Sequence, residues 1–264
     1  MNTPSALERT LQALLISGIS VFAVLPSHAA EPARVTADNY VRAESDFQMR
    51  GYVEKLDCFG KLYHSRKPYD VNSQVTVRGN RDTLYSFGVF DLTSPLTITL
   101  PETGGRYQSL MVVNQDHSLA AAYSPNVVTL TEENVGTRYV MLTVRTFMNP
   151  NDAADVAAAH RLQDAVKVEQ ADTGVLDLPN WDQDELEQMR NAINVVGSTV
   201  TDTSKMFGRK EDLDPVYWML GAALGWGGLP AEAATYLNSC PSRMMARPRT
   251  SLRSRMCQWM PFGL

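Results

Sequence analysis

Residues 96–113, LTITLPETGGRYQSLMVV, decide the fold class of this chain. Apolar and polar side chains alternate from Leu96 to Leu100, which is the period of a half-buried β-strand. A Gly104-Gly105 turn then leads into a second run, residues 107–113, that is rich in aromatic and β-branched side chains. Similar short runs occur at residues 75–77, 127–130 and 139–144. This series predicts an antiparallel β-sandwich or barrel.

A helical pattern precedes the β-rich stretch. Between residues 36 and 59, apolar side chains recur at the spacing of one helix face. Glu44, Asp46 and Arg50 belong to the polar remainder of that pattern. The pattern therefore predicts an amphipathic helix ahead of the strands.

Three more helices are expected after residue 150. Asn151 or Asp152 is placed to cap the first, and Asp182 the second, with Glu185 as its capping-box partner. The buried stripe of the second helix is expected to contain Leu186, Met189, Ile193 and Val196. The third helix should span residues 214–224, with Pro215 in its first turn. Strands followed by helices predict an α+β protein, and the lack of βαβ alternation argues against a nucleotide-binding parallel sheet.

Composition excludes several classes of protein. The 264 residues include 24 Lys and Arg against 29 Asp and Glu, so the formal net charge is −5. A hydrophobic content of 44% with 20% charged residues is that of a globular protein. No basic stripe is present, so we expect no nucleic-acid partner. The 3 cysteines are too few for a disulfide scaffold.

The first 30 residues have the features of a secretory signal peptide. Arg9 precedes an apolar core between Leu14 and Leu25, and small residues follow up to Ala30. The apolar core is shorter than the roughly 18 residues that a membrane-spanning helix needs. We expect the segment to be removed, leaving a periplasmic or secreted protein without a membrane partner.

Several short motifs resemble one bacterial family. They are NRDTLYS at residues 80–86, DL at 91–92, LP at 100–101 and GRY at 105–107. Together they resemble the family called domain of unknown function 1254 (DUF1254), and NWDQ at 180–183 and MFG at 206–208 resemble its helical continuation. The resemblance implies an immunoglobulin-like antiparallel β-sandwich, then a small helical domain. It also implies a jelly-roll-like third part, domain of unknown function 1214, which this sequence lacks.

The resulting domain plan ends in an anomalous tail. We expect a signal peptide at 1–30, a helical segment at 35–68, the β-sandwich at 70–148 and a helical domain at 150–238. Residues 239–264 are rich in Arg and Met and follow neither period, which indicates a disordered tail. A shifted reading frame of the same stretch gives an alternating, strand-like string that resembles the start of domain 1214. We therefore expect the chain to be truncated or frameshifted after Asn238.

The densest polar cluster lies at the start of a predicted strand. It contains the candidate ligand-binding residues Asn80, Arg81, Thr83 and Tyr85. Arg81 could clasp a carboxylate or phosphate, with Asp82 as base or acceptor. The alternative is a structural turn in which Asn80 and Asp82 fix the start of the strand. Strand alternation predicts that Thr83, Tyr85 and Phe87 share one face, and that Leu84, Ser86 and Gly88 share the other.

A second hypothesis concerns catalysis. His117 follows a strong strand and, with Ser86 as nucleophile and Asp82 as acid, is a candidate for ester hydrolysis. The alternative is that His117 is an ordinary surface-loop histidine. No G-x-S-x-G nucleophile elbow supports the enzyme.

Other site types receive little support from the sequence. No H-x-x-x-H or C-x-x-C spacing occurs, so neither a metal nor another cofactor is expected. The aromatic residues of the helical part either line a pocket with Arg209 or Lys210 at its lip or pack in the core; they are Trp181, Tyr217, Trp218 and Trp226.

Three functional interpretations follow. The first is an exported protein that binds a small molecule or a partner in the cell envelope, with a homo-oligomer left open. The second is the carboxylic-ester hydrolase. The third is a truncated copy without function.

Overall fold

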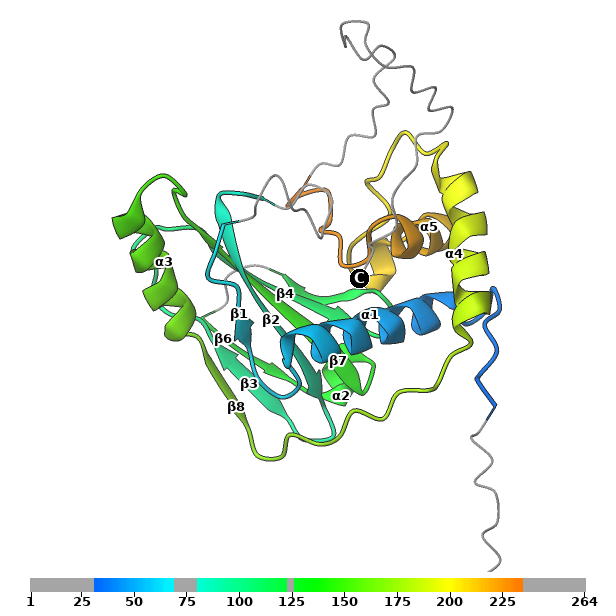
Figure 1. The fold of residues 1–264 in the computed structure, drawn as a ribbon, viewed down its shortest axis with the longest axis horizontal. Helices are drawn as coiled ribbons and strands as arrows, with labels where there is room; N and C mark the ends of the chain where they lie inside the picture. The colour runs from blue at the N-terminus through cyan, green and yellow to red at the C-terminus, as the bar shows by residue number, and fades with distance from the viewer. Residues whose placement is uncertain (1–30, 69–79, 123–125, 235–264) are drawn as a thin grey trace, which may run out of the picture. The chain divides into compact units, whose positions relative to one another are not determined.

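The computed structural model describes residues 31–68, 80–122 and 126–234 (Figure 1). The expected signal peptide at 1–30, the predicted strand at 75–77 and the tail at 239–264, for which a frameshift is expected, lie outside these residues. The expectation that a third domain is lacking is likewise not tested by the described residues.

A five-stranded antiparallel sheet forms the centre of the fold. Its strands are arranged in the order β1-β2-β7-β4-β5. Their bounds are Tyr63–His64 for β1, Thr83–Asp91 for β2, Tyr139–Phe147 for β7, Gln108–Asn114 for β4 and Leu119–Ala122 for β5. The central strand, β7, pairs with β2 and β4 along its length, with Tyr85 and Ser109 both opposite Arg145.

A three-stranded antiparallel sheet packs against the first one. Its order is β6-β3-β8, with bounds Val127–Leu130, Leu96–Thr99 and Lys167–Gln170. The alternation that predicted β3 is confirmed, because Leu96 and Ile98 are buried while Thr97 and Thr99 are half-buried. Apolar side chains from both sheets form one buried cluster that includes Phe90, Leu110 and Leu142. The predicted α+β class with an antiparallel β-sandwich is thus confirmed.

In the described part of the chain, five α-helices and one 3-10 turn accompany the sheets. They are α1 (Tyr40–Leu56), α2 (Glu132–Val135), α3 (Ala153–Asp164), α4 (Gln183–Gly197), η1 (Lys210–Asp212) and α5 (Pro215–Gly225). Figure 1 shows α1 lying across the five-stranded sheet, with α4 and α5 beside it. Met49 of α1 shares a buried cluster with Val89, Met111 and Met141 of the sheet. The helices also share a buried cluster of their own, which contains Tyr40, Leu186 and Leu220.

The polar residues of α1 face inward, contrary to the amphipathic pattern. Glu44, Ser45 and Asp46 are all buried. Each receives hydrogen bonds from a distant element: Glu44 from Arg190, Ser45 from Trp226, and Asp46 from Gln115 and Trp181. The helix is therefore enclosed by the sheet on one side and by α4 and α5 on the other. Burial raises the pKa of Asp46, against the hydrogen bonds from Gln115 and Trp181.

The helix caps follow the sequence closely. Asp152 accepts hydrogen bonds from the backbone N–H groups of α3, and Asp214 from those of α5. Asp182 caps α4 by accepting from the N–H of Glu185 at 3.0 Å. Glu185 does not complete a capping box; its carboxylate instead accepts from the N–H of Val35, which fastens the chain ahead of α1.

Two expectations for the helical region are wrong in detail. Val196 of α4 is 57% exposed, because the buried stripe of that helix consists of Leu186 and Ile193, with Met189 partly buried. Strand β8 lies within the range 150–238 that was expected to be helical. The alternation of side chains in β8 covers only four residues, which is too short to predict a strand from the sequence. The segment becomes a strand because it pairs with β3.

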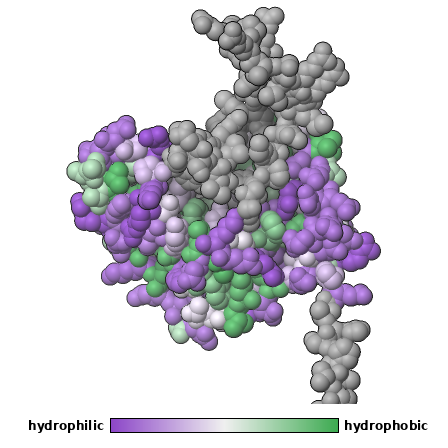
Figure 2. Space-filling view, viewed as in Figure 1, coloured by the Kyte–Doolittle hydropathy of each residue, from purple (hydrophilic) through white to green (hydrophobic). Residues whose placement is uncertain are grey.

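The surface of the described part is mixed. Figure 2 shows hydrophilic residues over most of the visible face, with hydrophobic residues gathered in smaller patches among them. Within the described ranges, no helix combines the length and the apolar character that crossing a membrane requires.

Candidate ligand-binding site

The predicted polar cluster, residues 80–86, consists of an exposed part before β2 and a more buried part within β2. Asn80, Arg81 and Asp82 precede the strand and are exposed. The carboxylate of Asp82 accepts a hydrogen bond from the hydroxyl of Thr83 at 3.2 Å, and its carbonyl oxygen accepts from the N–H of Met148. The second of these contacts joins the start of β2 to the end of β7.

Within β2, the predicted alternation is confirmed. Phe87 belongs to the cluster beneath α1, whereas Ser86 and Leu84 point to the opposite face of the sheet. Tyr85 stacks on Phe87, with ring centroids 5.7 Å apart and planes inclined by 8°. Tyr85 and Ser86 therefore lie on opposite faces.

Ser86 contacts a histidine that the sequence did not suggest. Its hydroxyl oxygen lies 2.7 Å from Nδ1 of His64 on β1, and it also accepts a hydrogen bond from the side-chain amide of Gln163. The hydroxyl of Ser86 therefore has two polar neighbours, the imidazole of His64 and the amide of Gln163. Burial, followed by the charge of Arg66, lowers the pKa of His64, which favours the neutral form of its imidazole. Ser86 is 0% exposed, so this pair joins β1, β2 and α3 beneath the surface.

His117 is neither a surface histidine nor a partner of Ser86. It lies in the turn between β4 and β5, with φ at 53°, and is 4% exposed. Its ring stacks on Trp226, with centroids 5.8 Å apart, and its Nε2 accepts the N–H of Gly227 at 2.9 Å. Burial lowers the pKa of His117 to about 3, so the ring is neutral at physiological pH. The proposed set of Asp82, Ser86 and His117 is not assembled by this fold.

The tryptophans of the helical part also serve packing. Trp181, Trp218 and Trp226 donate indole N–H hydrogen bonds to Asp46, to the carbonyl of Asp116 and to Ser45. Arg209 and Lys210 are exposed at the start of η1. The core-packing alternative therefore describes these indoles.

The face of β2 that carries Thr83 and Tyr85 continues across the sheet into a distinct patch. Its nine positions form three rows across β2, β7 and β4, with Arg145 at the centre. We call it the Arg145 patch. In each row the residues are given in the order β2, β7 and β4. The end row is Thr83, Phe147 and Tyr107, the middle row is Tyr85, Arg145 and Ser109, and the row nearest α1 is Phe87, Thr143 and Met111. Arg145 is the one charged side chain among these nine positions.

The guanidinium of Arg145 is incompletely bonded. Its Nε and Nη1 are buried and have no hydrogen-bond partner among the described residues. The guanidinium carbon lies 5.9 Å from the centroid of the Tyr107 ring, which is a cation–π contact. A buried N–H without an acceptor costs about 1–3 kcal/mol, so this arrangement needs an explanation.

Other arginines of the described chain show what Arg145 lacks. Each of the following forms an ion pair with a carboxylate: Arg34, Arg42, Arg66, Arg106, Arg138 and Arg190. The best enclosed of these acids is Asp91, which Arg138 contacts at 2.8 Å. Burial opposes the ionisation of Asp91, but hydrogen bonds from Arg138, Thr93 and Val175 outweigh it and lower its pKa to about 2. A carboxylate is therefore the usual complement of arginine in this fold.

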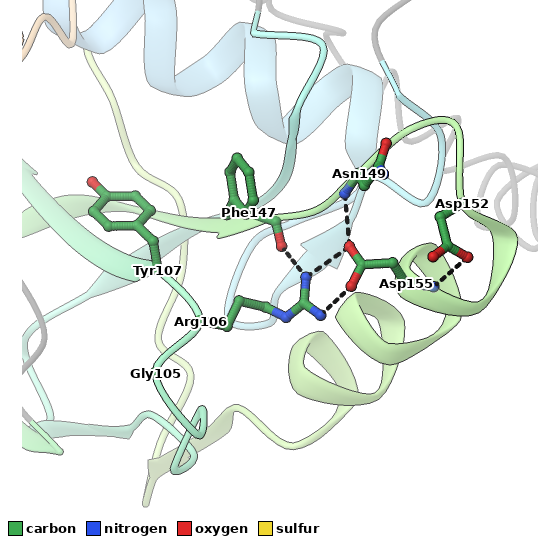
Figure 3. Close-up of a pocket in the computed structure, with 7 residues that line it drawn as sticks. All are labelled: Gly105, Arg106, Tyr107, Phe147, Asn149, Asp152 and Asp155. Carbon is green, nitrogen blue, oxygen red and sulfur yellow. Dashed lines mark hydrogen bonds and ion pairs between the residues drawn. The ribbon is translucent and has the colours of Figure 1, made fainter.

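A cavity opens at the end row of the patch. Its volume is about 610 Å³, and its lining includes Tyr107 and Phe147. Figure 3 shows Arg106 and Asp155 pointing toward each other below the strand, with the ring of Phe147 on the other side. Arg106 binds both oxygens of Asp155, at 3.0 and 2.5 Å, and also the carbonyl of Phe147. The arginine of the GRY motif thus fastens α3 to the end of β7, and is occupied.

A metal centre has no support in the described residues. Within them, no three His, Cys, Asp or Glu side chains lie close enough together to hold an ion. Cys58 is buried and free, and burial raises its pKa to about 11. The thiol is therefore protonated and unsuited to metal ligation.

Sequence reasoning missed both Arg145 and His64. The strand expected at residues 139–144 stops one residue short of Arg145, although the alternation continues through Thr143, Arg145 and Phe147. A charged residue inside such a run was the available signal. His64 offered none, because β1 is two residues long and becomes a strand only through its pairing with β2.

Comparison with known proteins supports the family and the fold. Residues 59–133 match the family described as "Protein of unknown function (DUF1254)". Among solved structures, the crystal structure of the VPA0106 protein from Vibrio parahaemolyticus is similar, with a TM-score of 0.54 and 12% sequence identity. The match covers 73% of this chain and 66% of that protein, and at this identity it shows the fold alone. A search of curated proteins finds no match. The motifs between Asn80 and Tyr107 lie inside the matched range, so the predicted resemblance to this family is confirmed for residues 59–133.

Proposed function

We propose that this chain is an exported protein of the cell envelope that binds a small organic anion through Arg145. Export rests on the signal-like pattern of residues 1–30. Binding rests on one observation, which is that Nε and Nη1 of Arg145 are buried without a hydrogen-bond partner in the described part of the chain.

The position of the arginine is fixed by strand pairing on both sides. It lies on β7, which is the central strand of the five-stranded sheet and is paired on both sides at Arg145. The backbone therefore cannot move the charge away from the patch without breaking the sheet. A fixed guanidinium with open donors is suited to bidentate binding of a carboxylate or phosphate.

A binding role is better supported than ester hydrolysis. Ser86 is enclosed on the face of β2 opposite to Arg145, and its hydroxyl is already bonded to His64 and Gln163. A ligand held at Arg145 would be separated from Ser86 by the sheet itself. This separation supports binding at Arg145 over hydrolysis by the Ser86 candidate.

The proposal is tested by isothermal titration calorimetry on the purified chain. Four anions are titrated separately: acetate, octanoate, 4-phenylbutyrate and inorganic phosphate. We expect at least one to bind, and we expect Arg145→Met to weaken that binding by about 10- to 100-fold, which is the value of a hydrogen bond to a charged group.

The matched control is Arg161→Met. Arg161 is an exposed arginine on α3, so its replacement removes the same charge from the molecule but not from the patch. Binding that is equally strong in Arg145→Met, or equally weakened in both variants, would contradict the proposal.

A further inference from the structure

The surroundings of Arg145 specify the class of anion more narrowly. Resting on the proposed function, we infer that the ligand is an apolar monocarboxylate, with its carboxylate on Arg145 and its hydrocarbon body over Tyr107 and Phe147. The inference depends on the charge of the patch, on its aromatic content and on the position of the cavity.

The charge of the patch fits a single negative charge. Arg145 is the one charged side chain of its nine positions, and its nearest neighbours across the strands are Tyr85 and Ser109. Arg106, the nearby arginine of the GRY motif, is neutralised by Asp155. Phosphate sites usually combine several cations or a helix N-terminus, and neither is present among the nine positions of the patch. One guanidinium instead matches the planar fork of one carboxylate.

The remainder of the patch is suited to an apolar body. Tyr107 and Phe147, in the end row, are 47% and 43% exposed, so their rings are accessible to a ligand. On β2, Tyr85 stacks on Phe87, and Phe87 contacts Tyr52 of α1 at a centroid distance of 5.0 Å. Aromatic faces of this kind bury hydrocarbon chains and rings favourably.

The cavity shows where the body would lie. Tyr107 and Phe147 belong both to the end row of the Arg145 patch and to the lining of the 610 Å³ cavity. The other end of the patch leads to Phe87 and Met111, which share a buried cluster with α1. A ligand anchored at Arg145 therefore extends away from α1 and over Tyr107 and Phe147, which form the aromatic side of the cavity. The other residues of the lining are Gly105, Arg106, Asn149, Asp152 and Asp155. That volume lies within the range of about 300–1,000 Å³ that small-molecule sites occupy.

The ranking of probes tests this class. We expect octanoate and 4-phenylbutyrate to bind at least about tenfold more tightly than acetate, which is less than the value of burying two methylene groups. They should also bind more tightly than inorganic phosphate. The neutral analogue 4-phenylbutanol should bind at least about tenfold more weakly than 4-phenylbutyrate, because it cannot form an ion pair with Arg145. A difference between octanoate and 4-phenylbutyrate decides whether the body is a chain or a ring.

Variants separate the two ends of the ligand. Phe147→Ala should weaken 4-phenylbutyrate by about tenfold and leave acetate unchanged. The control is Val127→Ala, which truncates an exposed apolar residue of β6 on the other sheet. Arg145→Met should weaken every carboxylate but not 4-phenylbutanol.

Three unfavourable results would refute different parts of the proposal: the anion site, the apolar character of the ligand, or the position of its hydrocarbon body. If phosphate or acetate binds at Arg145 as tightly as the apolar acids, the proposed anion site stands and the apolar monocarboxylate is refuted. If 4-phenylbutyrate binds equally well to the wild-type chain and to Arg145→Met, both claims fail. If Phe147→Ala changes nothing while Arg145→Met abolishes binding, the direction given for the hydrocarbon body is wrong.

Discussion

Replacing Arg145 by methionine should make the unliganded protein more stable. A ligand-binding residue with unbonded, buried donors is a cost to the fold until the ligand arrives. Nε and Nη1 of Arg145 are both buried without a partner among the described residues, and each such group costs about 1–3 kcal/mol. Methionine keeps much of the apolar stem and introduces no donor.

The expected gain follows from two opposing contributions. Removing the donors relieves about 2 kcal/mol or more, whereas losing the contact between the guanidinium and the ring of Tyr107 costs about 0.5–1 kcal/mol. We therefore expect the free energy of unfolding of Arg145→Met to rise by about 1–2 kcal/mol. For a chain of this size that corresponds to a Tm increase of roughly 2–8 °C.

The assay is urea denaturation followed by tryptophan fluorescence, without any ligand present. Arg161→Met is the control and should change stability by less than about 0.5 kcal/mol, as expected of an exposed site. If Arg145→Met instead destabilises the chain by more than about 1 kcal/mol, the guanidinium is a structural residue with a partner of its own. The basis for an anion site would then be lost.

The remaining predictions concern the framework around the site. The pKa of Asp91 is lowered to about 2 in the folded chain, so its stabilising contribution is fully present above the unfolded pKa near 3.8. We therefore expect the free energy of unfolding to fall by about 2 kcal/mol between pH 4 and pH 2. Urea denaturation of Asp91→Asn should not show this fall, and a pH profile like that of the wild-type chain would contradict the prediction. Asp46→Ala leaves the donors of Gln115 and Trp181 buried and should cost about 2–4 kcal/mol by urea denaturation, whereas the exposed control Asp184→Ala should cost little; equal effects would argue against the buried network. A fluorophosphonate probe should not label the enclosed Ser86, and labelling that disappears in Ser86→Ala would restore the hydrolase hypothesis.

The sheets were the most predictable part of the fold, for a local reason. In β3, deeper burial of one face of the strand imposes a period of two, which can be read from the sequence without knowing the neighbouring strand. The caps Asp152, Asp182 and Asp214 are predictable for the same reason, because each bonds backbone groups within a few residues of itself.

The interior of α1 was not predictable, because its partners are far away in the chain. Glu44 and Asp46 look like solvent-facing charges in the sequence, yet they bond Arg190 and Trp181, which follow more than a hundred residues later. His117 was misjudged for the same reason. A loop after a strand is normally exposed, but this one lies under Trp226 and Gly227.

The candidate site was predictable in part. The alternation that places Thr83 and Tyr85 on one face of β2 predicted one edge of the Arg145 patch. Tyr107 was noted only within the GRY motif of the family and was not predicted as a site residue. The centre of the patch depends on the pairing of β7 with both neighbours, which sequence periodicity does not reveal. That dependence also explains why Ser86 was matched with the wrong histidine.

The most direct test of the anion site is the NMR signal of the Arg145 side chain itself. In a ¹⁵N-labelled chain, the Nε–Hε cross-peak of Arg145 is identified by its absence from Arg145→Met. On addition of 4-phenylbutyrate we predict that this cross-peak shifts and that its hydrogen exchange slows, while the cross-peak of exposed Arg161 stays in place. A cross-peak that remains unchanged at saturating ligand would show that the anion binds elsewhere, and the site proposed for this chain would be wrong.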